Sequence, residues 1–323
     1  MTDPQAALAT LMPIQIITRQ GVSHPFGDKR TVKQAFPNPI PSEQSDPFLM
    51  CDYFDSPSTG VAQHPDDFPI NWHPHSGFDI CSYLKKGFGR HGDSLGNRET
   101  FEAPGMQWIS TGSGVEHAEG GATPAGQEVE GFQIWINVPA NKKQLDPRYG
   151  TVPTPDLPAL PLNGGKSTVR VLAGEAFGTK GPFDTVQPVQ MMDFELQPSD
   201  EVSFPIGGDF DTTILYVYDG ELTHLNHQTG SHSQSSAIPR GSVILMDASM
   251  PDKRHIELKA STKGAHVMVF AGRKLRQPIS WHGPIVLNTH DEITETIRAI
   301  RSGQFPPVRV QWDYKKIASK PKE

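Results

Sequence analysis

The stretch N-W-H-P-H-S-G-F-D at residues 71–79 places two histidines, His73 and His75, two positions apart in a segment with the character of a β-strand. Side chains at positions i and i+2 of a strand point to the same face of the sheet. Two imidazoles would therefore lie side by side, which costs free energy in an apolar interior unless both find polar partners. The pair thus requires further polar groups on the same side of the fold.

A second pair of this kind occurs in V-E-H-A-E at residues 115–119, where His117 and Glu119 share one face of a strand. Two strands that each carry a same-face pair can converge on one point inside a β-barrel. Three imidazoles and one carboxylate suit a divalent transition metal, whereas structural zinc sites use thiolates and Ca²⁺ or Mg²⁺ sites use oxygen alone. Such a site would keep open positions for a substrate. The alternative is that the histidines cap surface turns and that Glu119 is solvated.

The rest of the sequence predicts an all-β fold. Thirty glycines and thirty prolines separate short runs that are rich in β-branched and aromatic residues. The strand-like runs are residues 80–84, 132–138, 168–173, 213–218, 242–246 and 266–270. One short helix is expected near the C-terminus, in T-H-D-E-I-T-E-T-I-R-A-I-R-S-G, with Thr289 as N-cap and Gly303 after its last turn.

Two domains are expected from the length of 323 residues and from a proline-rich connector at residues 151–165. We expect residues 1–160 to form an N-terminal metal-binding barrel. Residues 161–323 are expected to form a second, degenerate barrel that includes the terminal helix and the basic tail. The tail, D-Y-K-K-I-A-S-K-P-K-E at residues 313–323, is expected to be a solvated chain end.

The two halves share an order of sequence signals that indicates a duplication. In the second half, F-P-I at residues 204–206 occupies the place of H-P-H at residues 73–75. Phe204 and Ile206 would then replace the two histidines. The second barrel is therefore expected to be filled with hydrocarbon where the first has polar residues.

Composition and charge exclude several classes of protein. The net charge of −7 and the absence of a basic stripe are unlike a direct nucleic-acid binder. Two cysteines, Cys51 and Cys81, are too few for a disulfide framework. The N-terminus lacks the pattern of a signal peptide, and no run of about 18 apolar residues occurs. We expect a cytoplasmic protein without a membrane segment.

Several motifs together resemble the pirin family within the cupin superfamily, over roughly residues 20 to 305. The motifs are D-P-F-L-M-C-D-Y-F-D (46–55), H-P-H-S-G-F-D (73–79), R-H-G-D-S-L-G-N (90–97), P-G-M-Q-W-I-S-T-G-S-G-V-E-H-A-E (104–119), G-F-Q-I-W-I-N-V-P (131–139), V-R-V-L-A-G-E-A-F-G (169–178) and H-G-P-I-V-L-N-T (282–289). The resemblance implies a bicupin, with two β-sandwich or barrel domains and a single mononuclear metal in the first. Its ligands would be His73, His75, His117 and Glu119, as the bare pattern had also indicated.

The resemblance implies a metal-dependent dioxygenase that cleaves a flavonol such as quercetin, or a related phenolic compound, with O₂. Fe(II) is the expected ion, with Mn, Co, Ni, Cu or Zn as alternatives, and Glu119 is the expected proton acceptor. The alternative function is a non-enzymatic, metal- or redox-responsive transcriptional co-regulator that acts through a protein partner. A vestigial barrel with an unfilled site is a third possibility. We expect a monomer.

Two further groups of residues allow more than one interpretation. Gln133, Trp135 and Asn137 share one face of a strand and either line a pocket or pack in the core. His91 and Asp93 are expected in a hairpin loop, where turn formation is the simpler explanation for them.

Overall fold

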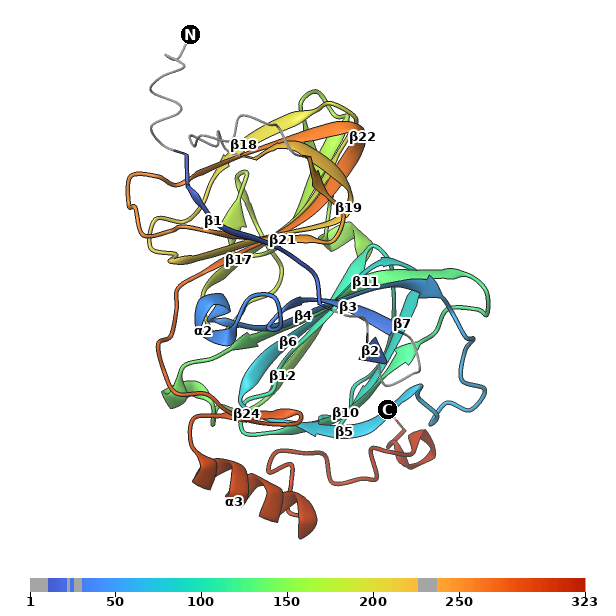
Figure 1. Ribbon diagram of the computed structural model, residues 1–323. Helices are drawn as coiled ribbons and strands as arrows, with labels where there is room; N and C mark the ends of the chain where they lie inside the picture. The colour runs from blue at the N-terminus through green and yellow to red at the C-terminus, as the bar shows by residue number, and fades with distance from the viewer. Residues whose placement is uncertain (1–10, 22–23, 26–30, 226–236, 323) are drawn as a thin grey trace. The chain divides into compact units, whose positions relative to one another are not determined.

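The computed structural model describes residues 11–21, 24–25, 31–225 and 237–322, and β-strands form most of this part of the chain (Figure 1). The expected all-β architecture is therefore confirmed. The described residues form two compact units. We call residues 24–25, 31–33, 49–156 and 275–322 the N-terminal unit, and residues 11–21, 34–48, 157–225 and 237–274 the C-terminal unit.

Segments toward both ends of the chain belong to a different unit from the one that a single boundary at residue 160 would give them. In the C-terminal unit, β1 (Ile14–Arg19) pairs with β21 (Ser242–Met246). In the N-terminal unit, a bridge joins Ser76 to Ile285, which belongs to β24 (Ile285–Leu287), and Val286 is buried beside Phe78. Residues 275–322, which were expected in the second domain, thus belong to the unit that contains His73 and His75.

Two antiparallel sheets form the N-terminal unit. The smaller one has the order β5-β10-β7-β8, with strands β5 Ile70–His75, β7 Phe88–Asp93, β8 Arg98–Glu102 and β10 Val115–Gly121. The larger one has the order β12-β9-β6-β11-β4-β3-β2, with strands β2 His24–Pro25, β3 Thr31–Phe36, β4 Phe48–Pro57, β6 Phe78–Lys86, β9 Gly105–Ser110, β11 Glu128–Asn137 and β12 Arg148–Val152. A hairpin of β23 (Ser280–His282) and β24 completes the unit.

One nine-stranded sheet forms most of the C-terminal unit, in the order β1-β21-β19-β22-β17-β14-β13, with β18 on β22 and β20 on β19. Its other strands are β13 Leu160–Leu162, β14 Ser167–Ala173, β17 Val189–Leu196, β18 Glu201–Pro205, β19 Thr212–Leu225, β20 Ile238–Pro239 and β22 His255–Gly272. Outside this sheet lie the pair β15 (Glu175–Ala176) and β16 (Thr179–Lys180) and the four-residue α2 (Ser42–Ser45).

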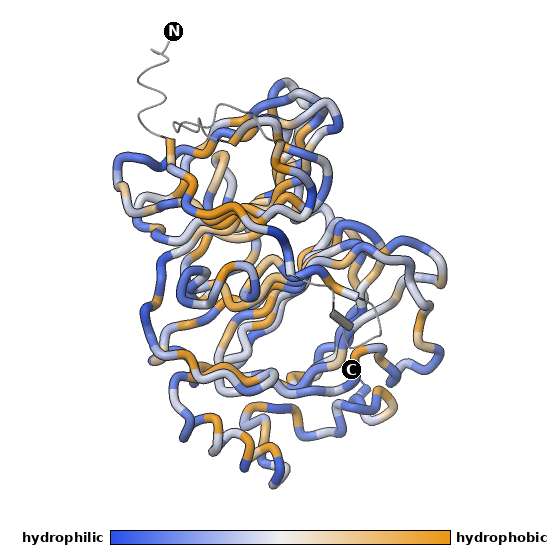
Figure 2. The backbone as a smooth tube through the Cα atoms, in the orientation of Figure 1, coloured by the Kyte–Doolittle hydropathy of each residue, from blue (hydrophilic) through white to orange (hydrophobic). Residues whose placement is uncertain are grey.

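The interior of the C-terminal unit is hydrocarbon, as expected. Phe204 and Ile206 are both buried in a cluster of apolar side chains from β14, β17, β19, β21 and β22. Figure 2 shows the hydrophobic residues concentrated along the strands, while many connecting loops are hydrophilic. Burial of this apolar surface is the main favourable term in folding, and no polar pair stands where the first half has His73 and His75.

The predicted terminal helix is confirmed as α3 (His290–Arg301). Thr289 is its N-cap and forms a capping box with Glu292, which satisfies two backbone N–H groups at the helix start. Ile293 packs with Ile285 and Leu287 of β24, so the helix anchors the C-terminal segment to the N-terminal unit. Short 3₁₀ turns occur at Ala140–Lys142, Thr154–Asp156 and Ile317–Ser319. Within the described residues, no helix has the length and apolar character needed to cross a membrane.

Candidate metal centre

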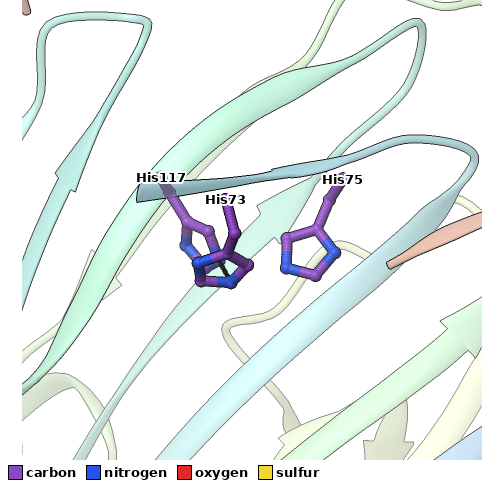
Figure 3. Close-up of side chains that lie close together, drawn as sticks. All are labelled: His73, His75 and His117. Carbon is purple, nitrogen blue, oxygen red and sulfur yellow. Dashed lines mark hydrogen bonds between the residues drawn. The ribbon is translucent and has the colours of Figure 1, made fainter. Parts of the chain in front are cut away.

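Strands β5 and β10 bring three of the predicted ligands together. In the antiparallel register His117 lies directly opposite His73, and His75 lies two residues further along β5. The ring centroids are 4.3 Å apart for His73 and His117, and 4.8 Å apart for the other two pairs. Figure 3 shows the three rings turned toward one another. Each ring offers one nitrogen to a group whose members all lie within 4.8 Å of one another.

The hydrogen bonds of two rings fix which nitrogens are available to a metal. Nδ1–H of His73 donates to the carbonyl oxygen of Asn71 over 2.7 Å, and Nδ1–H of His75 donates to that of Pro284 over 3.0 Å. A neutral imidazole that donates through Nδ1 presents the lone pair of Nε2. Nε2 of His73 lies 2.9 Å from Nε2 of His117. Two nitrogens that bind one ion at about 2.1 Å and at right angles are about 3 Å apart, so this spacing fits two ligands of one metal.

Burial favours the neutral form of two of the rings, those of His75 and His117. Burial lowers the pKa of His75 well below its usual value, and the nearby His73 lowers it further. Burial likewise lowers the pKa of His117, with smaller contributions from His73, His75 and His91. Because a metal ion binds the deprotonated imidazole, a lowered pKa leaves these ligands ready for it near neutral pH.

Glu119, the fourth predicted ligand, is buried but does not join this cluster of ligand atoms within the described residues. Nε2 of Gln107 donates to one carboxylate oxygen over 3.2 Å, and Nε2 of Gln133 donates to the other over 3.3 Å. A bulge in β5 shifts the register, so that Glu119 pairs with Ile70. The role of Glu119 as a metal ligand stays a prediction.

A cavity of about 40 Å³ reaches the Glu119 carboxylate. The polar part of its lining comprises Ser82, Arg90, Gln107 and Gln133 besides Glu119, and the apolar part comprises Phe54, Ile70, Leu84, Phe88, Phe101 and Val129. A small group of polar side chains in an otherwise apolar hollow is typical of sites for organic ligands. Glu119 therefore belongs to the lining of a small, mostly apolar cavity.

Three side chains that share one face of β11 have different roles. Gln133 lines the cavity, as one interpretation of the sequence expected. Trp135 packs its ring 5.3 Å from that of His75. Asn137 accepts a hydrogen bond from Nζ of Lys143, a buried lysine that no motif of the sequence indicates.

His91 and Asp93 lie at the end of strand β7, so their expected place in a loop is wrong. Asp93 does organise the following turn, because it accepts hydrogen bonds from the N–H groups of Leu95 and Asn97. His91 is buried, 3.0 Å from the Asp93 carboxylate, and its ring lies 5.6 Å from that of His117. The signal that could have revealed it is the i, i+2 spacing with Asp93, which again places both side chains on one face.

The expectation that the basic tail is solvated is wrong for part of its length. Tyr314 is only 9% exposed, and its carbonyl oxygen accepts a hydrogen bond from Arg98 over 2.7 Å. Lys315 lies 3.2 Å from the carboxylate of Glu116. An aromatic residue between charged ones was the overlooked signal, since tyrosine buries a large apolar ring while its hydroxyl finds a partner.

Two β units, one with a three-histidine cluster and one filled with hydrocarbon, define a bicupin with a candidate metal centre. Family models confirm this class: the Pirin model matches residues 29–136, and the Pirin C-terminal cupin domain matches residues 191–306. A Pseudomonas aeruginosa protein named “Putative quercetin 2,3-dioxygenase” is 34% identical over 291 residues, which cover 87% of this chain and 94% of that protein. The chain belongs to the pirin family.

Solved structures agree with this assignment. A crystal structure of quercetin 2,3-dioxygenase from Acinetobacter baumannii matches with a TM-score of 0.78 and 26% identity, over 92% of this chain and 99% of that one. The bacterial pirin YhhW of Escherichia coli, solved in complex with nickel(II), matches with a TM-score of 0.57 and 18% identity. That match covers 80% of this chain and all of YhhW, and it shows the shared fold alone.

Proposed function

We propose that this protein is a mononuclear metal-dependent dioxygenase that acts on a phenolic substrate. The observation that carries the proposal is the 2.9 Å spacing of the Nε2 atoms of His73 and His117, with His75 beside them. The names of the Pseudomonas and Acinetobacter proteins support the reaction class. Fe(II) is the proposed ion, and Mn, Co, Ni, Cu and Zn are the alternatives.

A divalent ion at this centre would supply Lewis acidity toward a phenolic hydroxyl and redox chemistry with O₂. The chain itself supplies the proton acceptor, Glu119, which lines the cavity. Gln107 and Gln133 hold this carboxylate from two sides. Glu119 is also a candidate fourth ligand, because it follows His117 by two residues on β10.

The size of the cavity limits the substrate. Pockets for drug-sized ligands enclose roughly 300–1,000 Å³, far more than the cavity of about 40 Å³ beside Glu119. A three-ring flavonol can therefore enter only if the apolar wall of Phe54, Leu84 and Phe101 moves outward. A single-ring catechol requires a smaller movement. Both kinds of compound belong in the test.

Oxygen consumption tests the proposal. Fe(II)-loaded protein is mixed with quercetin, or with a single-ring catechol, in an oxygen electrode, and His75→Ala is the comparison. We expect the wild type to consume O₂ with at least one compound and the variant to lose this activity. If the iron-loaded wild type consumes no O₂ with either, the dioxygenase proposal is contradicted, and a regulatory role through a protein partner takes its place. A cytoplasmic, monomeric protein is also part of the proposal.

A further inference from the structure

Residues 305–317, which we name the C-terminal strap, run along the sheet β5-β10-β7-β8 after helix α3 (Figure 1). The ring of Phe305 packs directly on Gly114, the residue before β10, so closely that a Cβ at Gly114 would lie 2.3 Å from a ring carbon. The N–H of Val310 donates to the carbonyl oxygen of Ser94 over 3.0 Å. These contacts hold the strap against the strands that contain the histidines.

Tyr314 contacts residues of both β5 and β10. Its hydroxyl donates to the carboxylate of Glu116, and its ring centroid lies 5.4 Å from that of Trp72. Burial raises the pKa of Tyr314, and Glu116 raises it further, so the hydroxyl keeps its proton and stays a donor. The backbone carbonyl of Tyr314 is held in turn by Arg98.

Lys315 reinforces the same point of contact. Its Nζ lies 3.2 Å from the Glu116 carboxylate and 5.9 Å from the centre of the Trp72 ring. Lys316, the next residue, is exposed and has its ion pair with Asp313 of the strap itself, at 3.9 Å. Lys315 therefore forms its ion pair with the sheet, whereas Lys316 forms its ion pair within the strap.

The residues that Tyr314 and Lys315 contact are the immediate neighbours of His73 and His117 in the sequence. Trp72 precedes His73 on β5, and Glu116 precedes His117 on β10. Neighbouring residues on a strand point to opposite faces of the sheet. On β10 this alternation places Glu116 on the face that the strap contacts and His117 on the opposite face. Trp72 lies at the bulge of β5, and its ring contacts with Tyr314 and Lys315 place it on the strap side, while His73 is paired directly with His117.

We infer that the C-terminal strap is an outer support of the metal centre, with Tyr314 and Lys315 as positioning residues that act through Glu116 and Trp72. The inference rests on the proposed metal site. Partners that orient metal ligands change metal affinity by about 10- to 100-fold. The strap acts one layer further out, through the backbone of β5 and β10, so a smaller effect of roughly three- to tenfold is expected.

The test uses the full chain and three variants: Tyr314→Phe, Lys315→Met and Lys316→Met. Tyr314→Phe keeps the ring on Trp72 and removes only the hydrogen bond to Glu116. Lys316→Met matches Lys315→Met in charge and size but leaves the contact of Lys315 with Glu116 intact. Co(II) affinity is measured by competition titration, and the visible spectrum of bound Co(II) reports ligand geometry. In metal-free protein, ¹H–¹⁵N spectra of the histidine rings report the same geometry without any ion.

We expect Tyr314→Phe and Lys315→Met to weaken Co(II) binding by roughly three- to tenfold, to shift the Co(II) bands, and to move the ring signals of His73 and His117. Lys316→Met should match the wild type in all three measurements. If the first two variants also match a wild type that binds Co(II), the strap inference is overturned and the metal site stands. If the wild type binds no Co(II), the metal site is wrong, and the strap inference falls with it.

Discussion

His75 and Pro284 are 209 residues apart in the chain, yet Nδ1–H of His75 donates to the carbonyl oxygen of Pro284 over 3.0 Å. The hydrogen bond fixes the ring so that Nε2 faces the other two histidines. Pro284 is followed by β24, which Lys143 holds: Nζ donates to the carbonyl oxygens of Gly77 and Val286 over 2.6 and 3.1 Å. A segment from the end of the chain therefore completes the surroundings of the metal centre.

Close packing between Gly77 and β24 gives a first prediction. Gly77 has φ +93°, and an added Cβ would lie 2.0 Å from the carbonyl oxygen of Val286. Gly126 has φ +79°, with no atom within 4 Å of an added Cβ. A left-handed conformation costs an L-residue about 1–2 kcal/mol. We expect Gly126→Ala to lower the free energy of unfolding by about that amount, and Gly77→Ala to lower it by more than about 3 kcal/mol because the backbone must also move.

Urea denaturation of the two variants measures this difference, and metal titration shows whether His75 has moved with Gly77. Gly77→Ala should also weaken metal binding, whereas Gly126→Ala should leave it unchanged. Equal losses of stability in both variants would show that β24 can move away without cost, contrary to the structure.

The predicted proton acceptor is tested by Glu119→Gln. The amide keeps the size of the side chain but cannot accept a proton, so the rate of O₂ consumption should fall by about 10²- to 10⁴-fold. Metal content should be retained, because the three histidines remain. Glu102→Gln, the same change at an exposed carboxylate of β8, serves as the control and should have no effect. A wild-type rate in Glu119→Gln would refute the assigned role, and loss of the metal would show that Glu119 is a ligand.

The local pattern of the sequence predicts the features that depend on near neighbours. The i, i+2 spacing of His73 and His75 places both rings on one face, and the capping box of Thr289 and Glu292 marks the start of α3. Phe204 in the place of His73 correctly predicts a hydrocarbon core in the second barrel.

Local sequence patterns could not predict the features that depend on distant parts of the chain. The bulge in β5 changes the register beside Glu119, and a bulge leaves no clear mark in a single sequence. The partner of His75 is a backbone carbonyl, that of Pro284, which any residue could supply. The basic composition of the tail concealed Tyr314, whose burial depends on where α3 directs the chain that follows it.

Because Lys143 is buried, we expect it to make the free energy of unfolding rise with pH in the alkaline range. Burial lowers its pKa from 10.5 to about 8, although Glu292 and Asp79 oppose the shift. The native pKa lies below that of the unfolded chain, so between pH 8 and 10.5 the unfolded state binds more protons and the free energy of unfolding rises with pH. A shift of this size corresponds to about 3 kcal/mol across the window.

Chemical denaturation of the wild type and of Lys143→Met, followed from pH 7.5 to about 10.5, measures this contribution as the difference between the two slopes, in which other titrating groups cancel. The ¹³Cε signal of Lys143 in the wild type should titrate with a midpoint near 8. Parallel slopes together with a midpoint near 10.5 would show that the lysine remains charged in the folded protein.

The claim on which the account depends is that Nε2 atoms of His73, His75 and His117 hold one ion. Anomalous X-ray scattering at the iron edge, from crystals of the Fe(II)-loaded protein, tests it directly. We predict a single peak per chain at about 2.1 Å from each of the three nitrogens, and no such peak in His117→Ala. A wild-type map with no peak among these rings, or with its iron elsewhere in the chain, would contradict the account.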